Sequence, residues 1–193
     1  MHHIGIADEL FIRGDIPMTK EEIRILTLVK AKIVATDIVV DVGAGTGSLS
    51  IEAALLADQG HVFAVEKKAA GVSLIKQNAV KFGTTNLTVI EGEAPKALQA
   101  LPTPNVVLIG GSGKNLPAIL AWSDAKLPIG GRIIINCVTV ETLALSLQLL
   151  AQLSHYSYSA VQVQVTRLNK IGSYHMSQAL NPIHIITAVK GEV

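Results

Sequence analysis

The sequence has one cysteine, few aromatic residues and almost no excess charge. Of its 193 residues, 4% are aromatic, and sixteen basic side chains are balanced by fifteen acidic ones, for a net charge of +1. This balance lacks the basic excess typical of nucleic-acid binding, and so few rings make a platform for stacked bases unexpected. A single cysteine cannot form a disulfide within the chain. We expect Cys137, in the apolar run 133–138, to be a buried small residue, with a reactive thiol as the alternative.

Long apolar runs are also missing. No stretch is long enough to cross a bilayer without polar interruption, and residues 1–8 lack a basic segment followed by an apolar one. We therefore expect a cytoplasmic protein without membrane contact. His2 and His3 are expected to belong to a terminal segment or a tag remnant rather than to a metal site, and no metal is predicted.

The chain contains short β-branched runs that alternate with helical patterns from Asp37 onward. The runs are nearly continuously apolar, which is typical of parallel strands covered by helices on both faces. We predict a single doubly wound α/β domain over residues 1–193, with an N-terminal segment and helix at 1–36 and a sheet core at 37–193. The predicted strands are Ile38 to Asp41, His61 to Glu66, Leu87 to Glu91, Val106 to Ile109 and Arg132 to Asn136.

Two further extended runs, Tyr156 to Thr166 and Pro182 to Val189, follow a helical pattern near Val140 to Leu153. Strands that follow one another without a helix predict an antiparallel hairpin at one edge of a mostly parallel, seven-stranded, Rossmann-like sheet. The polar stretch Thr166 to Met176 between them is long enough to cover a substrate, and a plain hairpin connection is the alternative.

The N-terminal helix is expected to begin at a capping box. Thr19 and Glu22 have the spacing at which the hydroxyl bonds the Glu22 backbone N–H and the carboxylate reaches back to the cap.

The segment Asp41 to Gly47 has a glycine at every second position, between a predicted strand and a helical pattern over Leu49 to Ala57. This arrangement places a ligand over a helix N-terminus. A dinucleotide fingerprint needs a third glycine where Ser48 stands, so a nicotinamide dehydrogenase is disfavoured. The spacing resembles the first motif of class I methyltransferases, which bind S-adenosylmethionine. A tight turn without a ligand is the alternative.

Further acids follow the next two strands, where such a fold needs them. Glu66 ends the second strand and is expected to accept hydrogen bonds from the ribose, and Glu93 and Ala94 after the third strand are expected to frame the adenine. Glu93 is one carbon longer than the aspartate common there. The predicted cofactor-binding residues are Thr19, Asp41, Gly43, Ala44, Gly45, Thr46, Gly47, Glu66, Glu93, Ala94 and Gly110.

The segment Gly110 to Gly113 ends the fourth strand and is expected to face the transferable methyl group. It has no Asn/Asp-Pro-Pro-aromatic motif for a planar amine and no nearby cysteine for a covalent cytosine mechanism. Two glycines and a serine leave open space and free N–H groups, which suits a bulky or anionic acceptor. A plain turn explains the segment equally well.

Several motifs together resemble the decarboxylating precorrin methyltransferases of cobalamin biosynthesis. The resemblance covers nearly the whole chain, and its most discriminating parts are Pro17-Met18-Thr19-Lys20 and Gly110-Gly111-Ser112-Gly113. It implies methylation of C15 of cobalt-precorrin-6B, or of its metal-free counterpart, with loss of carbon dioxide from the ring C acetate. It also implies contact of Thr19 with the cofactor, a homotetramer, and work beside a separate C5 methyltransferase.

A polycarboxylate acceptor predicts cationic and donor side chains near the cleft. The candidate substrate-binding residues are Arg13, Lys20, Arg24, Lys114, Arg167 and Lys170. Thr19, Ser112 and His175 are the candidates for assisting catalysis. A methyltransferase acting on RNA or protein, or a cofactor-binding module without activity, remains open from the residues alone.

Overall fold

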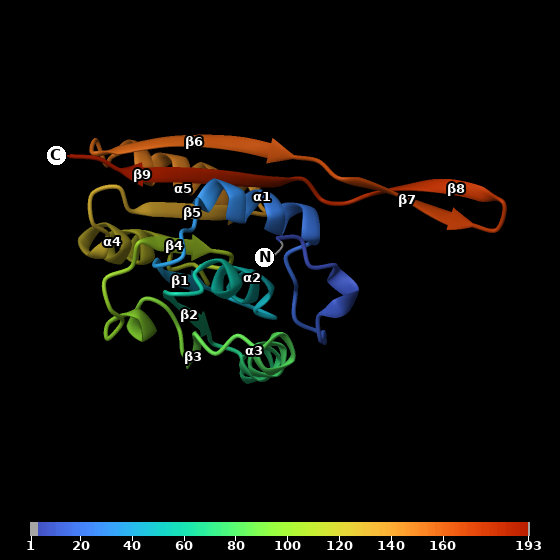
Figure 1. The fold of residues 1–193 in the computed structure, drawn as a ribbon. Coiled ribbons are helices and arrows are strands. Elements are labelled where there is room, and N and C mark those ends of the chain that lie inside the picture. The colour runs from blue at the N-terminus through green and yellow to red at the C-terminus, as the bar shows by residue number, and fades with distance from the viewer. Residues whose placement is uncertain (1–3, 193) are drawn as a thin grey trace.

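A computed structural model describes residues 4–192 of the chain, so His2 and His3 lie outside the described residues. A seven-stranded sheet forms the centre of the molecule (Figure 1), with strand order β3-β2-β1-β4-β5-β9-β6. Its strands are β1 (Ile38–Val42), β2 (His61–Glu66), β3 (Leu87–Glu91), β4 (Val106–Ile109), β5 (Arg132–Cys137), β6 (Tyr156–Val163) and β9 (Ile183–Lys190). The helices are α1 (Glu21–Ala31), α2 (Ser48–Leu56), α3 (Ala69–Phe82), α4 (Leu116–Lys126) and α5 (Val140–Ala151), with 3-10 turns η1 (Asp8–Leu10) and η2 (Lys96–Leu98).

The doubly wound prediction is confirmed. Strands β3, β2, β1, β4 and β5 are parallel, whereas β9 pairs antiparallel with both β5 and β6. The predicted strands match the observed ones to within a residue or two at their ends, except that the run from Tyr156 stops at Val163.

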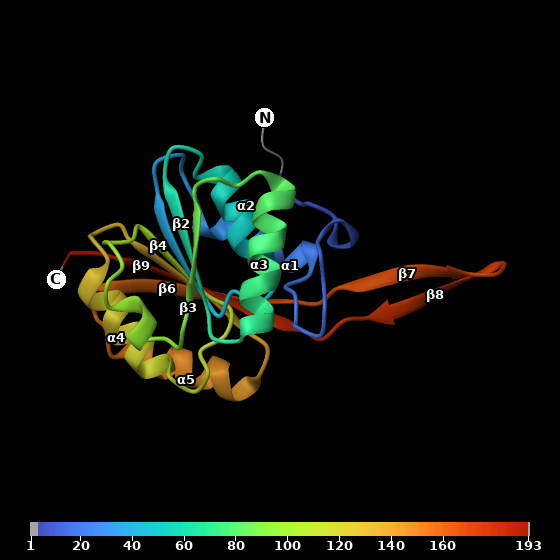
Figure 2. The same ribbon diagram turned by 90° about the horizontal axis from the view of Figure 1, so that it is seen from below.

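The helices cover both faces of this sheet (Figure 2). Neighbouring residues of one strand serve opposite faces, because side chains alternate along a strand. Val39 thus belongs to an apolar cluster with Leu28 and Ala53 of α1 and α2, whereas Val40 packs with Ile119 and the other buried residues under α4 and α5. Apolar residues at every position of the central strands follow from this two-sided burial.

Cys137 lies in the core at the end of β5, as predicted. It is fully buried, and burial raises the pKa of its thiol above the ordinary value. A thiol held in its protonated form is a poor nucleophile, so the residue acts as a small core side chain. No helix in residues 4–192 is long and apolar enough to cross a membrane.

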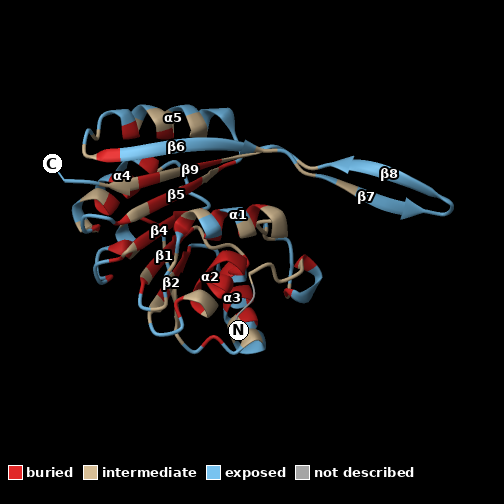
Figure 3. Ribbon diagram, turned by 45° about the horizontal axis from the view of Figure 1, so that its top comes forward, coloured by how far each residue is buried: buried red, intermediate tan, exposed pale blue. Residues whose placement is uncertain are grey.

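The polar stretch expected to be a covering loop is instead a second hairpin. Strands β7 (Thr166–Ile171) and β8 (Tyr174–Ala179) pair only with each other and project from the body (Figures 1 and 2). Almost every residue of this hairpin is exposed (Figure 3). The Leu180 N–H still bonds the Val165 carbonyl at 2.9 Å at the base of the hairpin. The predicted edge pairing of the two long runs is thus confirmed, and the lid conformation is wrong.

The capping box is also wrong, although the helix that it predicted is present. The cap of α1 is Lys20, and no side chain bonds the first turn. The carboxylate of Glu22 instead accepts two hydrogen bonds from Arg167, at 2.9 and 2.7 Å. A charge-assisted bidentate pair is stronger than a bond to a backbone N–H, so the glutamate turns away from the helix end.

Candidate active site

A cleft of about 530 Å³ lies at the carboxyl ends of the parallel strands. Strands β1 and β4 are neighbours in the sheet, but the chain runs to β2 on one side before it returns to β4 on the other. Such a switch point leaves a crevice where the following loops diverge, and ligands of doubly wound folds bind there. The predicted residues that line the cleft are Thr19, Lys20, Asp41, Gly43, Ala44, Gly45, Glu66, Glu93, Ala94, Gly110 and Ser112.

The glycine loop, residues 43–47, forms one side of this cleft and is closely packed against neighbouring backbone. Gly43 has φ of +73°, and a Cβ added to it would lie 2.5 Å from the Gly111 carbonyl oxygen. A Cβ on Gly45, at φ +59°, would lie 2.9 Å from the Pro17 carbonyl oxygen. The loop after β4 and the segment before α1 therefore touch the glycine loop directly, and only glycine permits both the approach and the left-handed backbone.

Asp41 lies under this loop with one carboxylate oxygen unpaired. It is 1% exposed, and Oδ2 accepts a hydrogen bond from the Ser50 hydroxyl at 2.5 Å. Oδ1 is buried and has no partner among the described residues. Burial, together with the nearby charge of Glu66, raises the pKa of the Asp41 carboxyl to about 6. A buried acceptor without a partner is costly, so this oxygen is suited to a cationic group in the cleft.

Glu66 is fixed by backbone donors on both oxygens. Oε2 accepts from the Gly45 N–H at 2.9 Å, and Oε1 accepts from the Lys68 N–H at 2.8 Å. The side chain is buried between the glycine loop and the start of α3, where a Cβ on Gly71 would lie 2.7 Å from its Cγ. The carboxylate therefore lies against the cleft wall in a single orientation, with lone pairs left for further donors.

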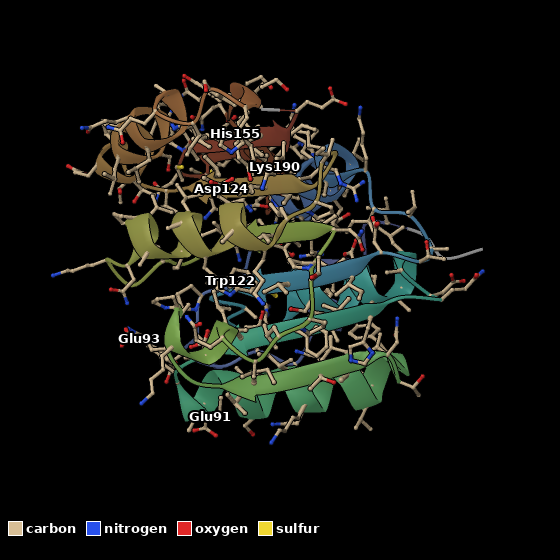
Figure 4. The ribbon with its side chains drawn as sticks, turned by 90° about the vertical axis from the view of Figure 1, so that its left-hand side faces the viewer. Glu91, Glu93, Trp122, Asp124, His155 and Lys190 are labelled. Carbon is tan, nitrogen blue, oxygen red and sulfur yellow. The ribbon has the colours of Figure 1, made fainter. Side chains whose placement is uncertain are left out.

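The two residues expected near adenine differ in their surroundings. Ala94 is buried, and its carbonyl accepts a hydrogen bond from the Asn115 amide at 2.9 Å. Glu93 has an exposed side chain and pairs at 3.0 Å with Lys67, which also lines the cleft. Figure 4 shows Glu93 at the outer edge of the body, beyond the end of β3 and near Glu91.

The half of the cleft away from β2 and β3 is lined by both polar and apolar residues. Its polar residues are Thr19, Asn136 and Asn181, with Lys20 at the start of α1. Its apolar residues are Ile23, Val138, Val165, Leu180 and Ile183. Sequence reasoning singled out neither Asn136 nor Asn181 for a site. The signal for Asn136 was a polar residue at the carboxyl end of an apolar strand.

Several predicted residues do not line the cleft. Thr46 is buried beneath the loop, and its carbonyl accepts a bond from Asn78 at 3.0 Å, while Gly47 is the cap of α2 and packs on Ile75. Among the candidates for contact with the acceptor, those outside the cleft lining are Arg13, Arg24, Lys114, Arg167, Lys170 and His175. His175 and Lys170 pair with each other across the projecting hairpin.

The structure corrects the assignment of Arg24 to the acceptor. Its side chain is 0% exposed and forms ion pairs with Asp8, at 3.2 Å, and with Glu52, at 2.5 Å. Arg24 also donates to the carbonyls of Ile6 and Thr19 and lies over the ring of Phe11. All of its nitrogens face the interior of the protein, so no group is left for a substrate.

Arg167 is tied to the same cluster from the base of the hairpin. It pairs with Asp8 at 3.2 Å and with Glu22 at 2.7 Å. These partners raise the pKa of its guanidinium, and Arg167 in turn lowers the pKa of Glu22. Asp8 therefore bridges two arginines and joins the hairpin base to the segment that borders the cleft.

Comparisons with known proteins agree with this geometry. Residues 9–190 match the model of the precorrin methyltransferase domain family. A relative from Pyrobaculum aerophilum, named a probable cobalt-precorrin-6B C(15)-methyltransferase (decarboxylating), is 41% identical over 187 residues, 95% of each chain. The cobalt-precorrin-6B C(15)-methyltransferase (decarboxylating) of Salmonella typhimurium is 37% identical over 97% of each chain. The chain belongs to the precorrin methyltransferase family.

Solved structures of enzymes that act on precorrins have the same fold. The precorrin-6y C5,15-methyltransferase of Geobacter metallireducens is 37% identical, with a TM-score of 0.92 and 97% of each chain covered. The precorrin 8w decarboxylase of Methanobacterium thermoautotrophicum is 31% identical, with a TM-score of 0.89, and covers 97% of this chain. A tRNA methyltransferase of Aquifex aeolicus, at 14% identity and a TM-score of 0.79, shares the fold alone.

Proposed function

We propose that this precorrin methyltransferase uses S-adenosylmethionine to methylate C15 of cobalt-precorrin-6B and removes the carboxyl group of the ring C acetate, giving cobalt-precorrin-7. The observation that carries the proposal is the unpaired, buried Oδ1 of Asp41 beneath a glycine loop in a chain of this family. We further propose that residues 1–193 form one domain that works in the cytoplasm.

The residues of the cleft fit the cofactor. Asp41 would bind the ammonium group of the cofactor, because its Oδ1 is unpaired. Glu66 would bind the ribose hydroxyls, because its carboxylate is held in place by backbone donors and still has free lone pairs. Ala94 and Glu93 would border the adenine. Gly43, Ala44, Gly45 and Gly110 would leave room for the chain of the cofactor, with Thr46 and Gly47 supporting the loop from behind.

When bound, the cofactor supplies a methyl group on a positively charged sulfur that leaves as a neutral thioether. An electron-rich carbon of the tetrapyrrole provides the electron pair for the new bond, so the protein has to orient the two groups rather than activate a nucleophile. Thr19 and Ser112 line the cleft and are proposed to hold the macrocycle near the methyl group, and Thr19 is proposed to contact the cofactor as well. His175 would act there only if the hairpin of a neighbouring copy reached the cleft.

Cationic side chains are proposed to hold the peripheral carboxylates of the acceptor. Lys20 lines the cleft, and Arg13, Lys114 and Lys170 lie outside its lining with exposed positions. Arg167 is engaged by Glu22 and Asp8, so its contribution would be to hold the hairpin base.

We also propose a homotetramer, beside a separate C5 methyltransferase as a pathway partner. An isolated two-stranded hairpin is marginally stable in water. Ile171, Tyr174 and Met176 share one face of this hairpin and are 57%, 76% and 56% exposed. Packing against other copies would bury this face.

The test is a single-turnover assay with the purified chain, labelled S-adenosylmethionine and cobalt-precorrin-6B, which follows methyl incorporation and carbon dioxide release together. Stoichiometric yields of both are expected. Binding of S-adenosylmethionine without either product would refute cobalt-precorrin-6B as the acceptor. RNA and protein would then be the acceptors to test. Absence of cofactor binding would refute the methyltransferase activity itself.

A further inference from the structure

The base of the projecting hairpin forms part of the wall of the cleft. Val165 precedes β7, Leu180 and Asn181 follow β8, and all three residues line the cleft. The base is closed by its own bonds, since the Leu180 N–H donates to the Val165 carbonyl at 2.9 Å and the Gln164 amide donates to the Leu180 carbonyl at 2.7 Å. The two strands therefore meet the cleft as one unit, and a shift of the hairpin base would shift this part of the wall.

The start of α1 contributes another part of the wall. Thr19, Lys20 and Ile23 line the cleft there, and Glu22 stands among them in the sequence. In Figures 1 and 2 this end of α1 lies beside the point where the hairpin leaves the body. Glu22 itself lies outside the cleft lining, because its carboxylate meets the hairpin.

Arg167 of β7 connects these two parts of the wall. Its Nε and Nη2 donate to the two carboxylate oxygens of Glu22 at 2.9 and 2.7 Å, and Nη2 also donates to Asp8 at 3.2 Å. The side chains of Arg167 and Glu22 are 36% and 37% exposed, whereas that of Asp8 is 7% exposed. A partly exposed ion pair usually contributes little, but bidentate geometry within a network of charges is an exception. The pair therefore holds the hairpin base against α1.

We infer that the ion pair between Arg167 and Glu22 positions the wall of the cleft that receives the acceptor, which rests on the proposed function. It sets the distance between the start of α1 and the hairpin base, both of which line the cleft. The guanidinium is occupied by the carboxylates of Glu22 and Asp8. Arg167 thus acts on the acceptor through the shape of the cleft, and Arg167 and Glu22 are both positioning residues.

Binding of the cofactor does not need this ion pair. The proposed cofactor groups follow β1, β2 and β3, whereas the hairpin lies between β6 and β9, beyond β4 and β5 on the other side of the sheet. The Thr19 carbonyl is bonded to Arg24 at 2.8 Å, and Arg24 is held in turn by Glu52. Loss of the ion pair would therefore affect the acceptor more than S-adenosylmethionine.

The test measures the KM for cobalt-precorrin-6B and the kcat of Arg167→Met, Glu22→Gln and the double variant. Each single change is expected to raise the KM about fivefold, the upper end of the effect of a partly exposed ion pair. The kcat is expected to change less, because the wall contacts are lost from the bound ground state and the transition state alike. The double variant is expected to match the single ones, since both changes break one interaction. The dissociation constant of S-adenosylmethionine, from calorimetry, is expected to stay within about twofold.

The variant Glu22→Gln separates positioning from direct contact with the acceptor. If Arg167 bound a carboxylate of the acceptor, Glu22→Gln would free the guanidinium and lower the KM, whereas Arg167→Met would raise it. Glutamine keeps an oxygen for Arg167, so this variant serves if Arg167→Met fails to fold. The matched control is Glu21→Gln, which should keep the wild-type KM, because Glu21 forms no ion pair within residues 4–192.

Four results would overturn the inference. They are an unchanged KM in both single variants, a lower KM in Glu22→Gln, additive losses in the double variant, and an equal loss of affinity for S-adenosylmethionine. If the wild type itself transferred no methyl group to cobalt-precorrin-6B, the proposed function would fail instead.

Discussion

The guanidinium of Arg24 donates a hydrogen bond to the backbone carbonyl of Thr19, with a distance of 2.8 Å from Nη1 to the oxygen. Thr19 borders the cleft, whereas Arg24 is fully buried between Asp8 and Glu52. Glu52 also accepts the N–H groups of Gly5 and Ile6. The conformation of the segment that borders the cleft is therefore set by charges in the interior.

Replacing Arg24 with methionine should leave the buried carboxylate of Glu52 without the cation that it pairs with, although the N–H groups of Gly5 and Ile6 remain. We expect the free energy of unfolding to fall by about 3 kcal/mol, as for other broken buried ion pairs. Urea denaturation measures the change, and Arg13→Met, at an exposed position, is the matched control for stability.

The same variant should weaken binding of S-adenosylmethionine, because the Thr19 segment loses its anchor. Calorimetry on the folded protein measures this effect. An unchanged dissociation constant would mean that the segment holds its position without Arg24.

Binding of the cofactor should depend on pH through Asp41. Its carboxyl has a pKa near 6, so below that pH the group must lose a proton before it can pair with an ammonium ion. The apparent dissociation constant should rise about tenfold for each pH unit below that pKa, and Asp41→Asn should remove this dependence together with most of the affinity. A flat pH profile in the wild type would show that Asp41 does not bind the ammonium group.

The raised pKa of Asp41 has an opposite effect on stability. The folded state binds the proton more tightly than the unfolded state, whose pKa is near 3.8, so this stabilisation is present at low pH and is lost as pH rises through about 6. Without cofactor at pH 8, the free energy of unfolding of Asp41→Asn should exceed that of the wild type by about 2 kcal/mol, because the variant has no buried charge at this position. The difference should shrink toward pH 4. Thermal unfolding across this range, with Glu91→Gln on the surface as control, measures it.

Gly43→Ala should disturb the cleft more than a backbone effect alone explains. Gly43 and Gly172 both have left-handed backbones, but a Cβ at Gly172 would meet nothing within 4 Å, whereas at Gly43 it would meet Gly111. Each variant should lose about 1–2 kcal/mol from backbone strain. Only Gly43→Ala should also lose cofactor affinity, measured by calorimetry, and equal affinities in the two variants would contradict the close approach of the loops.

The proposed tetramer can be tested at the base of the hairpin. Replacing residues 166–179 with Asn-Gly should let Val165 and Leu180 close a short turn, since they are already hydrogen-bonded. The shortened chain should be monomeric in light scattering while the full chain is tetrameric. A tetramer in both would place the contact elsewhere, and a monomer in both would refute the assembly.

The sheet could be predicted because strands buried on both faces are apolar at consecutive positions of the sequence. Val39 and Val40 are both apolar because each serves a different layer of helices. The glycine loop was predictable for a similar reason, since Gly43 and Gly45 occupy positions that exclude any side chain.

Charged residues were harder to place because their partners are distant in sequence. Arg24 and Glu52 are 28 residues apart, and Arg167 and Glu22 are 145 apart. The local sequence predicted that Glu22 belongs to a capping box. In the fold, Glu22 instead pairs with Arg167, and this ion pair is stronger than the predicted bond to a backbone N–H. Asn136 was missed because only the fold brings it to the wall of the cleft.

The position of β9 has a consequence for synthesis of the protein. This strand lies between β5 and β6, although it follows both along the chain, and Ile185, Ile186 and Ala188 fill the core from within it. Lys190 then fixes the strand end to Asp124 of α4, which also pairs with His155 (Figure 4). During synthesis on the ribosome, the position between β5 and β6 therefore stays empty until β9, up to Lys190, has left the exit tunnel. The unfinished sheet exposes two unpaired strand edges during that interval, and unpaired edges favour association with other chains.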